Sequence, residues 1–83
     1  GLGDVYKRQL GELAAPEHDQ LRLTVRSVLT SPDNADVIAA ALGVHKNTVR
    51  YRLHQAERLL GRPLAIRAGD LLLALDYYEA FLI

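Results

Sequence analysis

A short apolar segment that ends at a glycine constrains the fold of this chain more than any other feature. Asp33 or Asn34 can cap its start, because a side-chain oxygen there accepts from an exposed backbone N–H. The apolar run at residues 37–42 then stops at Gly43, which suits the positive φ that ends many helices. A helix of about two turns is unstable alone in water. We therefore expect it to pack on its neighbours.

The segment after this glycine predicts a longer helix with two different faces. It starts at His45 or Lys46, reaches Leu60 and is closed by Gly61. At about 1.5 Å per residue it is roughly 22 Å long. One side is apolar, formed by Val49, Leu53, Ala56 and Leu60. The opposite side is polar, formed by Asn47, Tyr51, His54 and Arg58, with Arg50 on the flank.

Two further segments have the apolar spacing of helices. One starts at Pro16, where the missing N–H of proline costs nothing, and its apolar stripe is formed by Leu21, Val25, Val28 and Leu29. The other runs from Asp70, its expected cap, through residue 82, with an apolar face of Leu71, Leu72, Leu75, Tyr78 and Leu82. No stretch alternates as a strand does. The expected fold class is all-α, a bundle of about four helices.

Residues 1–9 fit none of these patterns. Their run DVYKRQ at residues 4–9 resembles the translation of an adapter used to prepare sequencing libraries. We therefore expect residues 1–9 to be a library scar, and residues 10–83 to be the native domain and the C-terminal fragment of a longer protein. The alternative is an ordinary frayed terminus.

The net charge of zero hides a separation of charge along the 83 residues. Residues 44–67 carry six basic side chains and one acid, a net charge of +5. Residues 10–43 and 70–83 each carry a net charge of −3. Because its positive charge is concentrated in one stretch, the chain can attract a polyanion with one surface.

Composition argues against several other functions. The chain has no cysteine, so it can form neither a disulfide nor a thiolate metal site. His18, His45 and His54 do not form, with carboxylates or cysteines, the kind of ligand group that a zinc site shows. No apolar run approaches the roughly 18 residues of a membrane span. Neither a nucleophile–base pair nor a glycine-rich phosphate loop is visible, so we expect no catalytic residue, no metal and no cofactor.

Residues 38–53 meet several conditions of a helix-turn-helix at once. Such a motif needs a small residue where its helices cross, which Ala39 supplies, and a turn residue without Cβ strain, which Gly43 supplies. Apolar contacts that hold the pair at a steep angle can come from Ile38, Leu42, Val44 and Val49. The second helix must offer polar side chains to the major groove of DNA, which admits a helix. We therefore expect a small helix-turn-helix bundle that binds double-stranded DNA.

The stretch 34–64, centred on VHKNTVRYRL at residues 44–53, resembles the C-terminal DNA-binding domain of PucR/CdaR-type bacterial transcription regulators. The resemblance extends upstream to Leu10. It implies a cytoplasmic, nucleoid-associated regulator of a catabolic operon that acts as a homodimer or higher oligomer. The chain departs from the family at Ala56, where a larger aliphatic residue is usual, and at His54, where a basic residue is common.

We expect the DNA contacts to come from the second helix of the motif and its start: His45, Lys46, Asn47, Thr48, Arg50, Tyr51, Arg52 and His54. Lys46 and Arg50 can donate to guanine O6 and N7. Asn47 can pair with adenine through two hydrogen bonds.

The remaining candidates suit the sugar-phosphate backbone. Thr48 can bond a phosphate or cap the helix, and Tyr51 can lie along the backbone. His45 stands at the helix start, where a backbone N–H can also meet a phosphate. Arg52 lies nearer the apolar stripe and suits either a phosphate or an intramolecular bridge to an acid. His54 either contacts the groove or is idle surface.

Two other functions remain open. The core is also similar to the Fis-type architectural DNA-binding module, in Gly43, Val44, Thr48 and Leu53. From another class, a helical protein-interaction or dimerisation domain would turn its basic face to an acidic partner. Such a domain would show no sequence-dependent loss of binding on duplex DNA.

Overall fold

Five α-helices lie within residues 1–31 and 34–82, the part of the chain that the computed structural model describes. They are α1 (Leu2–Leu10), α2 (Asp19–Thr30), α3 (Ala35–Leu42), α4 (Lys46–Leu60) and α5 (Ala68–Tyr77). Two 3₁₀ turns, η1 (Gly11–Ala14) and η2 (Pro16–His18), join α1 to α2, and a π-helical turn, η3 (Tyr78–Leu82), follows α5. No strand occurs among the described residues, so the all-α prediction is confirmed.

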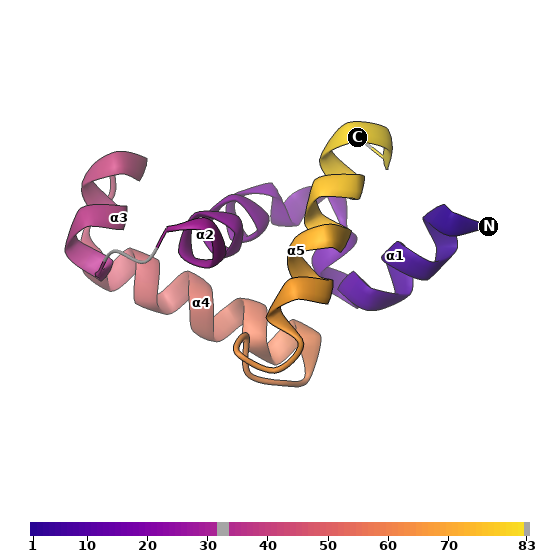
Figure 1. Cartoon of the computed structure of the whole chain (residues 1–83). Helices are drawn as coiled ribbons and strands as arrows, with labels where there is room; N and C mark the ends of the chain where they lie inside the picture. The colour runs from indigo at the N-terminus through magenta and orange to yellow at the C-terminus, as the bar shows by residue number, and fades with distance from the viewer. Residues whose placement is uncertain (32–33, 83) are drawn as a thin grey trace.

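Helix α4 runs along one side of the molecule and connects its two ends (Figure 1). Helix α3 lies at one end, α1 and α5 lie at the other, and α2 packs across α4 between them (Figure 1). The molecule measures 38 × 23 × 22 Å along its principal axes. The longest helix therefore packs against α2, α3 and the turn η1.

The turn between α3 and α4 is built as its sequence predicts. The side chain of Asn34 caps α3 by accepting from the backbone N–H of Val37 at 3.1 Å. The alternative cap, Asp33, lies outside the described residues. Gly43 ends the helix in the left-handed region, with φ of 72°. The backbone N–H of Val44 then donates to the carbonyl of Ala39 at 2.9 Å, which closes the turn.

A small apolar cluster holds α3 against α4. Its buried members are Ile38, Ala39 and Val49, and the side chains packed against them are Val28, Leu42, Val44 and Leu53. The lack of bulk at Ala39 lets the two helices approach closely. The four apolar contacts expected of the helix-turn-helix, Ile38, Leu42, Val44 and Val49, all lie in this cluster.

A larger core joins the other elements. It consists of Leu10, Leu13, Val25, Ala56, Leu64, Leu71, Ala74, Leu75 and Tyr78. The predicted inner face of the last helix is confirmed at Leu71, Leu75 and Tyr78, whereas Leu72 is half-buried. The side chain of Leu82, its fifth expected member, lies outside the described part of the structure.

Residues 2–10 form an additional helix that the apolar spacing does not predict. Tyr6 of α1 packs on Tyr77 of α5, with ring centroids 4.6 Å apart, and Leu10 is fully buried. This helix accounts for the difference between the four helices expected and the five found among the described residues. The derivation of residues 1–9 from an adapter remains a prediction, which sequencing of the source DNA across the junction tests.

Helix α5 begins earlier than expected. Its cap position is Arg67, which has φ of 57°, and not Asp70, which lies within the first turn. The carboxylate of Asp70 accepts from Arg67 Nε at 3.1 Å, so the predicted cap instead holds the residue that precedes the helix. The start of α2 differs in the opposite direction, because Pro16 opens the 3₁₀ turn η2 and the α-helix begins only at Asp19.

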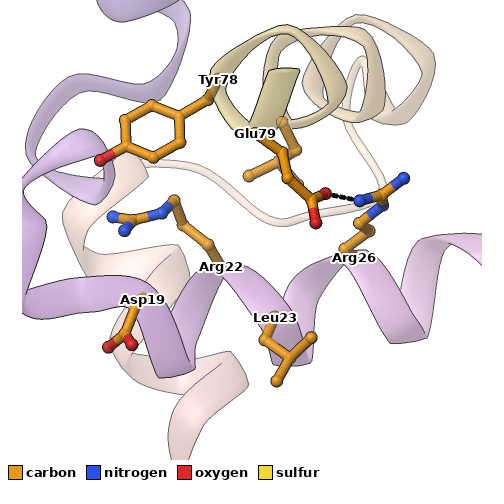
Figure 2. Close-up of a pocket in the computed structure, with 7 residues that line it drawn as sticks. Asp19, Arg22, Leu23, Arg26, Tyr78 and Glu79 are labelled. Carbon is orange, nitrogen blue, oxygen red and sulfur yellow. Dashed lines mark ion pairs between the residues drawn. The ribbon is translucent and has the colours of Figure 1, made fainter. Parts of the chain in front are cut away.

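A groove of about 240 Å³ separates α2 from α5 and η3 (Figure 2). Arg22 lies at one end, with its guanidinium carbon 4.2 Å from the centre of the Tyr78 ring. Arg26 lies at the other end and forms ion pairs with Asp76, at 2.9 Å, and with Glu79. The residues that line this groove come from α2, α5 and η3. Its walls therefore belong to the scaffold and not to α3 or α4.

Candidate nucleic-acid interface

Helix α4 separates an inner apolar side from an outer polar side. Val49 and Ala56 are fully buried, whereas Leu53 and Leu60 are half-buried. The predicted outer side chains are all exposed: Asn47, Arg50, Tyr51, His54 and Arg58. Tyr51, the largest of them, keeps 63% of its surface exposed. The division of the helix into two faces is thus confirmed.

His45 caps the start of α4. Its Nδ1 accepts from the backbone N–H of Asn47 at 3.0 Å, and its carbonyl accepts from the N–H of Thr48 at 2.9 Å. The position predicted for His45 is confirmed. The alternative that Thr48 caps this helix is wrong, because Thr48 is the third residue of the helix and is half-buried.

Lys46 lies beside an acidic residue of the supporting helix. Its Nζ is 4.0 Å from Oδ1 of Asp36, which is in the first turn of α3. Both side chains are exposed, so the attraction between them is weak and is screened by salt. Lys46 therefore remains available to a stronger anionic ligand.

Two sets of hydrogen bonds link side chains along the outer face of α4. Arg50 Nη1 donates to Oδ1 of Asn47 at 3.4 Å. One turn later, Nε2 of Gln55 donates to the hydroxyl of Tyr51 at 2.8 Å, and Oε1 of Gln55 accepts from Arg58 Nη1 at 3.4 Å. Gln55 is absent from the predicted site. Its spacing from its two partners, four residues and three residues, is the sequence signal that could have found it.

Arg52 lies at the boundary between α4 and α2. It is half-buried, and its Nη1 donates to the hydroxyl of Thr24 at 3.5 Å. Thr24 is fully buried and in turn donates to the carbonyl of Gln20. The prediction that Arg52 lies nearer the apolar stripe is confirmed, but its partner among the described residues is a hydroxyl rather than an acid.

Two charged side chains, Arg62 and Glu57, hold the connector after α4. Arg62 is half-buried, its Nη1 donates to the carbonyl of Ile66, and its Nη2 is buried without a hydrogen-bond partner among the described atoms. Glu57 accepts from the backbone N–H of Leu64 at 2.9 Å. These two side chains hold the connector in place, so Arg62 is a structural residue.

The outer face of α4 therefore presents cations and hydrogen-bond donors on a rigid helix. Among residues 1–31 and 34–82, no group of three or more His, Cys, Asp or Glu side chains is placed to hold a metal ion. None of the helices described is both long and apolar enough to cross a membrane. The chemistry that this face can perform is the binding of an anionic, acceptor-rich surface.

Comparison with known proteins agrees with this geometry. The family model of the PucR C-terminal helix-turn-helix domain matches residues 21–77, which is more than half of the chain. The transcriptional activator PmfR of Paenarthrobacter nicotinovorans is 35% identical over 66 residues, which cover 77% of this chain and 14% of that protein. An uncharacterized protein in the pkwA 5′ region of Thermomonospora curvata is 43% identical over 58 residues, which cover 68% of this chain and 32% of that protein.

The chain thus spans at most about a third of the length of these two relatives. No solved structure matches it. The matched region includes α3, the turn at Gly43 and all of α4. The chain therefore belongs to the family of the PucR C-terminal helix-turn-helix domain, a family of DNA-binding regulator domains and not of enzymes.

Proposed function

We propose that this domain binds double-stranded DNA in a sequence-specific manner, with α4 as the helix that enters the major groove. The observation that carries the proposal is the exposed polar face of α4, which lies opposite the fully buried Val49. Helix α3 packs through Ile38 and Ala39 against the buried side of the first turns of α4. A helix held in this way can present its first turns to base edges.

The proposed contacts follow from where each side chain lies. Lys46 and Arg50 are exposed in the first two turns and reach base edges, where guanine offers O6 and N7 as acceptors. The hydroxyl of Tyr51 and the side chain of His54 face the sugar-phosphate backbone. Arg52 lies at the rim of the interface, beside α2, and contacts a phosphate from there.

The start of α4 supplies a further phosphate contact. The backbone N–H of Asn47 is taken by the His45 side chain, and the N–H of Thr48 is taken by the His45 carbonyl. The N–H of Lys46 precedes both at the positive end of the helix dipole and suits a phosphate oxygen. Thr48, which is half-buried beside it, offers its hydroxyl to the same phosphate.

At the scale of the whole protein, we propose that this domain serves a bacterial transcription regulator that controls a catabolic operon in the cytoplasm. The relative named as a transcriptional activator supports a role in transcription. We further propose that the regulator binds as a homodimer or higher oligomer. Helix-turn-helix domains commonly pair on half-sites about 34–36 Å apart, which is one turn of the duplex.

Selection of bound duplexes from a random pool tests the proposal. Two copies of the 83-residue chain, joined by a flexible linker, should enrich an inverted or direct repeat. Failure to enrich any sequence while duplex DNA is still bound would favour an architectural module of the Fis type. Failure to bind duplex DNA at all would favour a helical protein-interaction domain.

The dependence of affinity on salt measures the same interface in a second way. If about four or five cationic side chains neutralise phosphates, the logarithm of the association constant should fall against the logarithm of salt concentration with a slope of roughly −4 per domain. Fluorescence anisotropy on the selected duplex at several salt concentrations measures this slope. A slope near zero would contradict a phosphate-binding face.

A further inference from the structure

The orientation of the Asn47 side chain is set by Arg50. Arg50 Nη1 lies 3.4 Å from Oδ1 of Asn47. A guanidinium has five N–H donors and no acceptor, so only the oxygen end of the amide can face it. The amide NH₂ group of Asn47 therefore points away from the guanidinium. At this position on α4, both side chains offer donors outward.

This arrangement conflicts with the usual way in which asparagine recognises adenine. That contact needs the amide oxygen to accept from the adenine N6 amino group while the amide NH₂ donates to N7. In this structure a cationic donor already lies against Oδ1 of Asn47. The adenine amino group is also a donor and would have to approach the same oxygen beside the guanidinium.

Guanine fits the same pair of side chains. Its major-groove edge presents two acceptors, O6 and N7, and no donor. Arg50 keeps its other N–H groups for these acceptors while one N–H is held by Asn47. An unrestrained arginine side chain loses rotamer entropy when it is fixed. A neighbour that restrains it before binding reduces that loss.

Asn47 is itself well placed to restrain its partner. Its backbone N–H is held by Nδ1 of His45 at 3.0 Å, at the first turn of the helix. Asn47 and Arg50 are three residues apart and so lie on the same face of α4. Both are exposed and are not drawn into either apolar cluster.

We propose that Asn47 is a positioning residue for Arg50, and that Arg50, held by Asn47, reads one guanine while Asn47 reads no adenine of its own. The inference rests on the proposed function of α4 as the recognition helix. It predicts a guanine in the part of the DNA site that faces the second turn of α4. It also makes the specificity of Arg50 depend on a neighbour that needs no base contact of its own.

The test compares base preference in four proteins: the wild type, Asn47→Ala, Arg50→Ala and the double variant. Each is assayed by competitive anisotropy on the selected duplex and on the same duplex with each base pair replaced in turn. Arg50→Ala should lose about 5- to 150-fold of discrimination at a single guanine position. Asn47→Ala should lose about 2- to 5-fold at that same position, and the double variant should match Arg50→Ala.

A conservative variant separates positioning from base contact. Asn47→Asp keeps an oxygen that can accept from Arg50 and removes the amide NH₂ group. It should preserve the guanine preference of the wild type, although its added negative charge lowers affinity for every duplex alike. Thermal unfolding of all variants confirms that the domain remains folded.

Three results would overturn the inference. The first is that Asn47→Ala relaxes the preference at a different base pair, one that carries adenine. The second is that the losses of discrimination in Asn47→Ala and Arg50→Ala multiply in the double variant. The third is that Asn47→Asp loses the guanine preference. A wild-type protein that selects no sequence would overturn the proposed function itself. That failure is recognised before any variant is made, so it is distinct from the other three.

Discussion

Gln55 connects two residues on the outer face of α4 that otherwise lie two turns apart. Its amide NH₂ donates to the hydroxyl oxygen of Tyr51, and its amide oxygen accepts from Arg58. Because the Tyr51 oxygen accepts this bond, the hydroxyl proton is free to point outward. Arg58 likewise keeps its other N–H groups. Two donors are therefore held in fixed positions where a phosphate can accept from both.

Replacing Gln55 tests this arrangement. Gln55→Ala should weaken binding by about 2- to 5-fold, because Tyr51 and Arg58 lose the bonds that hold them before DNA arrives. The loss should be equal on the selected duplex and on an unrelated duplex, since phosphates carry no sequence information. Anisotropy titrations on both duplexes measure it, with the exposed Gln20→Ala on α2 as the control. A loss confined to one base pair would contradict the phosphate role.

The difference between what sequence reasoning finds and misses is clear at the level of side chains. Exposure of Asn47 and Tyr51 follows from helical periodicity, because both lie opposite Val49. The contact of Arg52 with Thr24 joins residues 28 positions apart and depends on how α2 packs over α4. No local rule predicts which hydroxyl or carboxylate another helix brings near such a side chain.

The turn between α3 and α4 depends on a backbone conformation that most residues resist. Gly43 has φ of 72°, and a Cβ atom built there would meet no heavy atom within 4 Å. A side chain at this position therefore destabilises the fold through strain in its own backbone conformation and not through a steric clash with neighbouring residues. The left-handed turn between the two helices therefore favours a residue without a Cβ atom.

Substitutions of Gly43 should show that backbone strain, and not a steric clash, determines the loss of stability. Gly43→Ala should lower the free energy of unfolding by about 1–2 kcal/mol, because alanine is strained in the left-handed region. Gly43→Asn should cost less, since asparagine tolerates this conformation better than alanine. Urea unfolding followed by circular dichroism measures both. Equal stabilities for the alanine variant and the wild type would contradict a conformational role for the glycine.

Helix ends are predictable where one residue supplies the signal. Asn34, Gly43 and Gly61 mark the ends of α3 and α4 correctly, because capping is local chemistry. The start of α5 is missed, because Arg67 adopts φ of 57° without being glycine, and its bond to Asp70 appears only once the turn has formed. Helix α1 is missed because its support is the distant Tyr77.

At the scale of the whole molecule, Arg22 connects the N-terminal turns to the C-terminal helix. Its Nη1 donates to the carbonyls of Leu13 and Ala15 at 2.7 and 2.6 Å, and its guanidinium lies over the Tyr78 ring (Figure 2). Leu13 and Tyr78 both belong to the larger core. One half-buried cation thus fastens together parts of the chain that are far apart in sequence.

Removing this cation should destabilise the fold without affecting the interface. Arg22→Met should lower the free energy of unfolding by about 2–3 kcal/mol, through two carbonyls left without their donor and a lost cation–π contact. Arg8→Met, an exposed change on α1, should stay within about 0.5 kcal/mol of the wild type. Urea unfolding gives both values. Weaker DNA binding by the folded Arg22→Met protein would show that its role extends beyond the scaffold.

The two apolar clusters differ in size and share Leu53, which packs against both. The smaller one, whose buried members are Ile38, Ala39 and Val49, holds α3 against α4. Opening of α3 alone exposes little apolar surface, so it requires less free energy than global unfolding. When α3 opens in this way, most of α4 stays packed in the larger core, but its first turns lose their contact with α3. The rigidity of the outer face of α4 therefore depends on this smaller cluster. On the proposed function of α4, a duplex that contacts its first turns stabilises α3 as well.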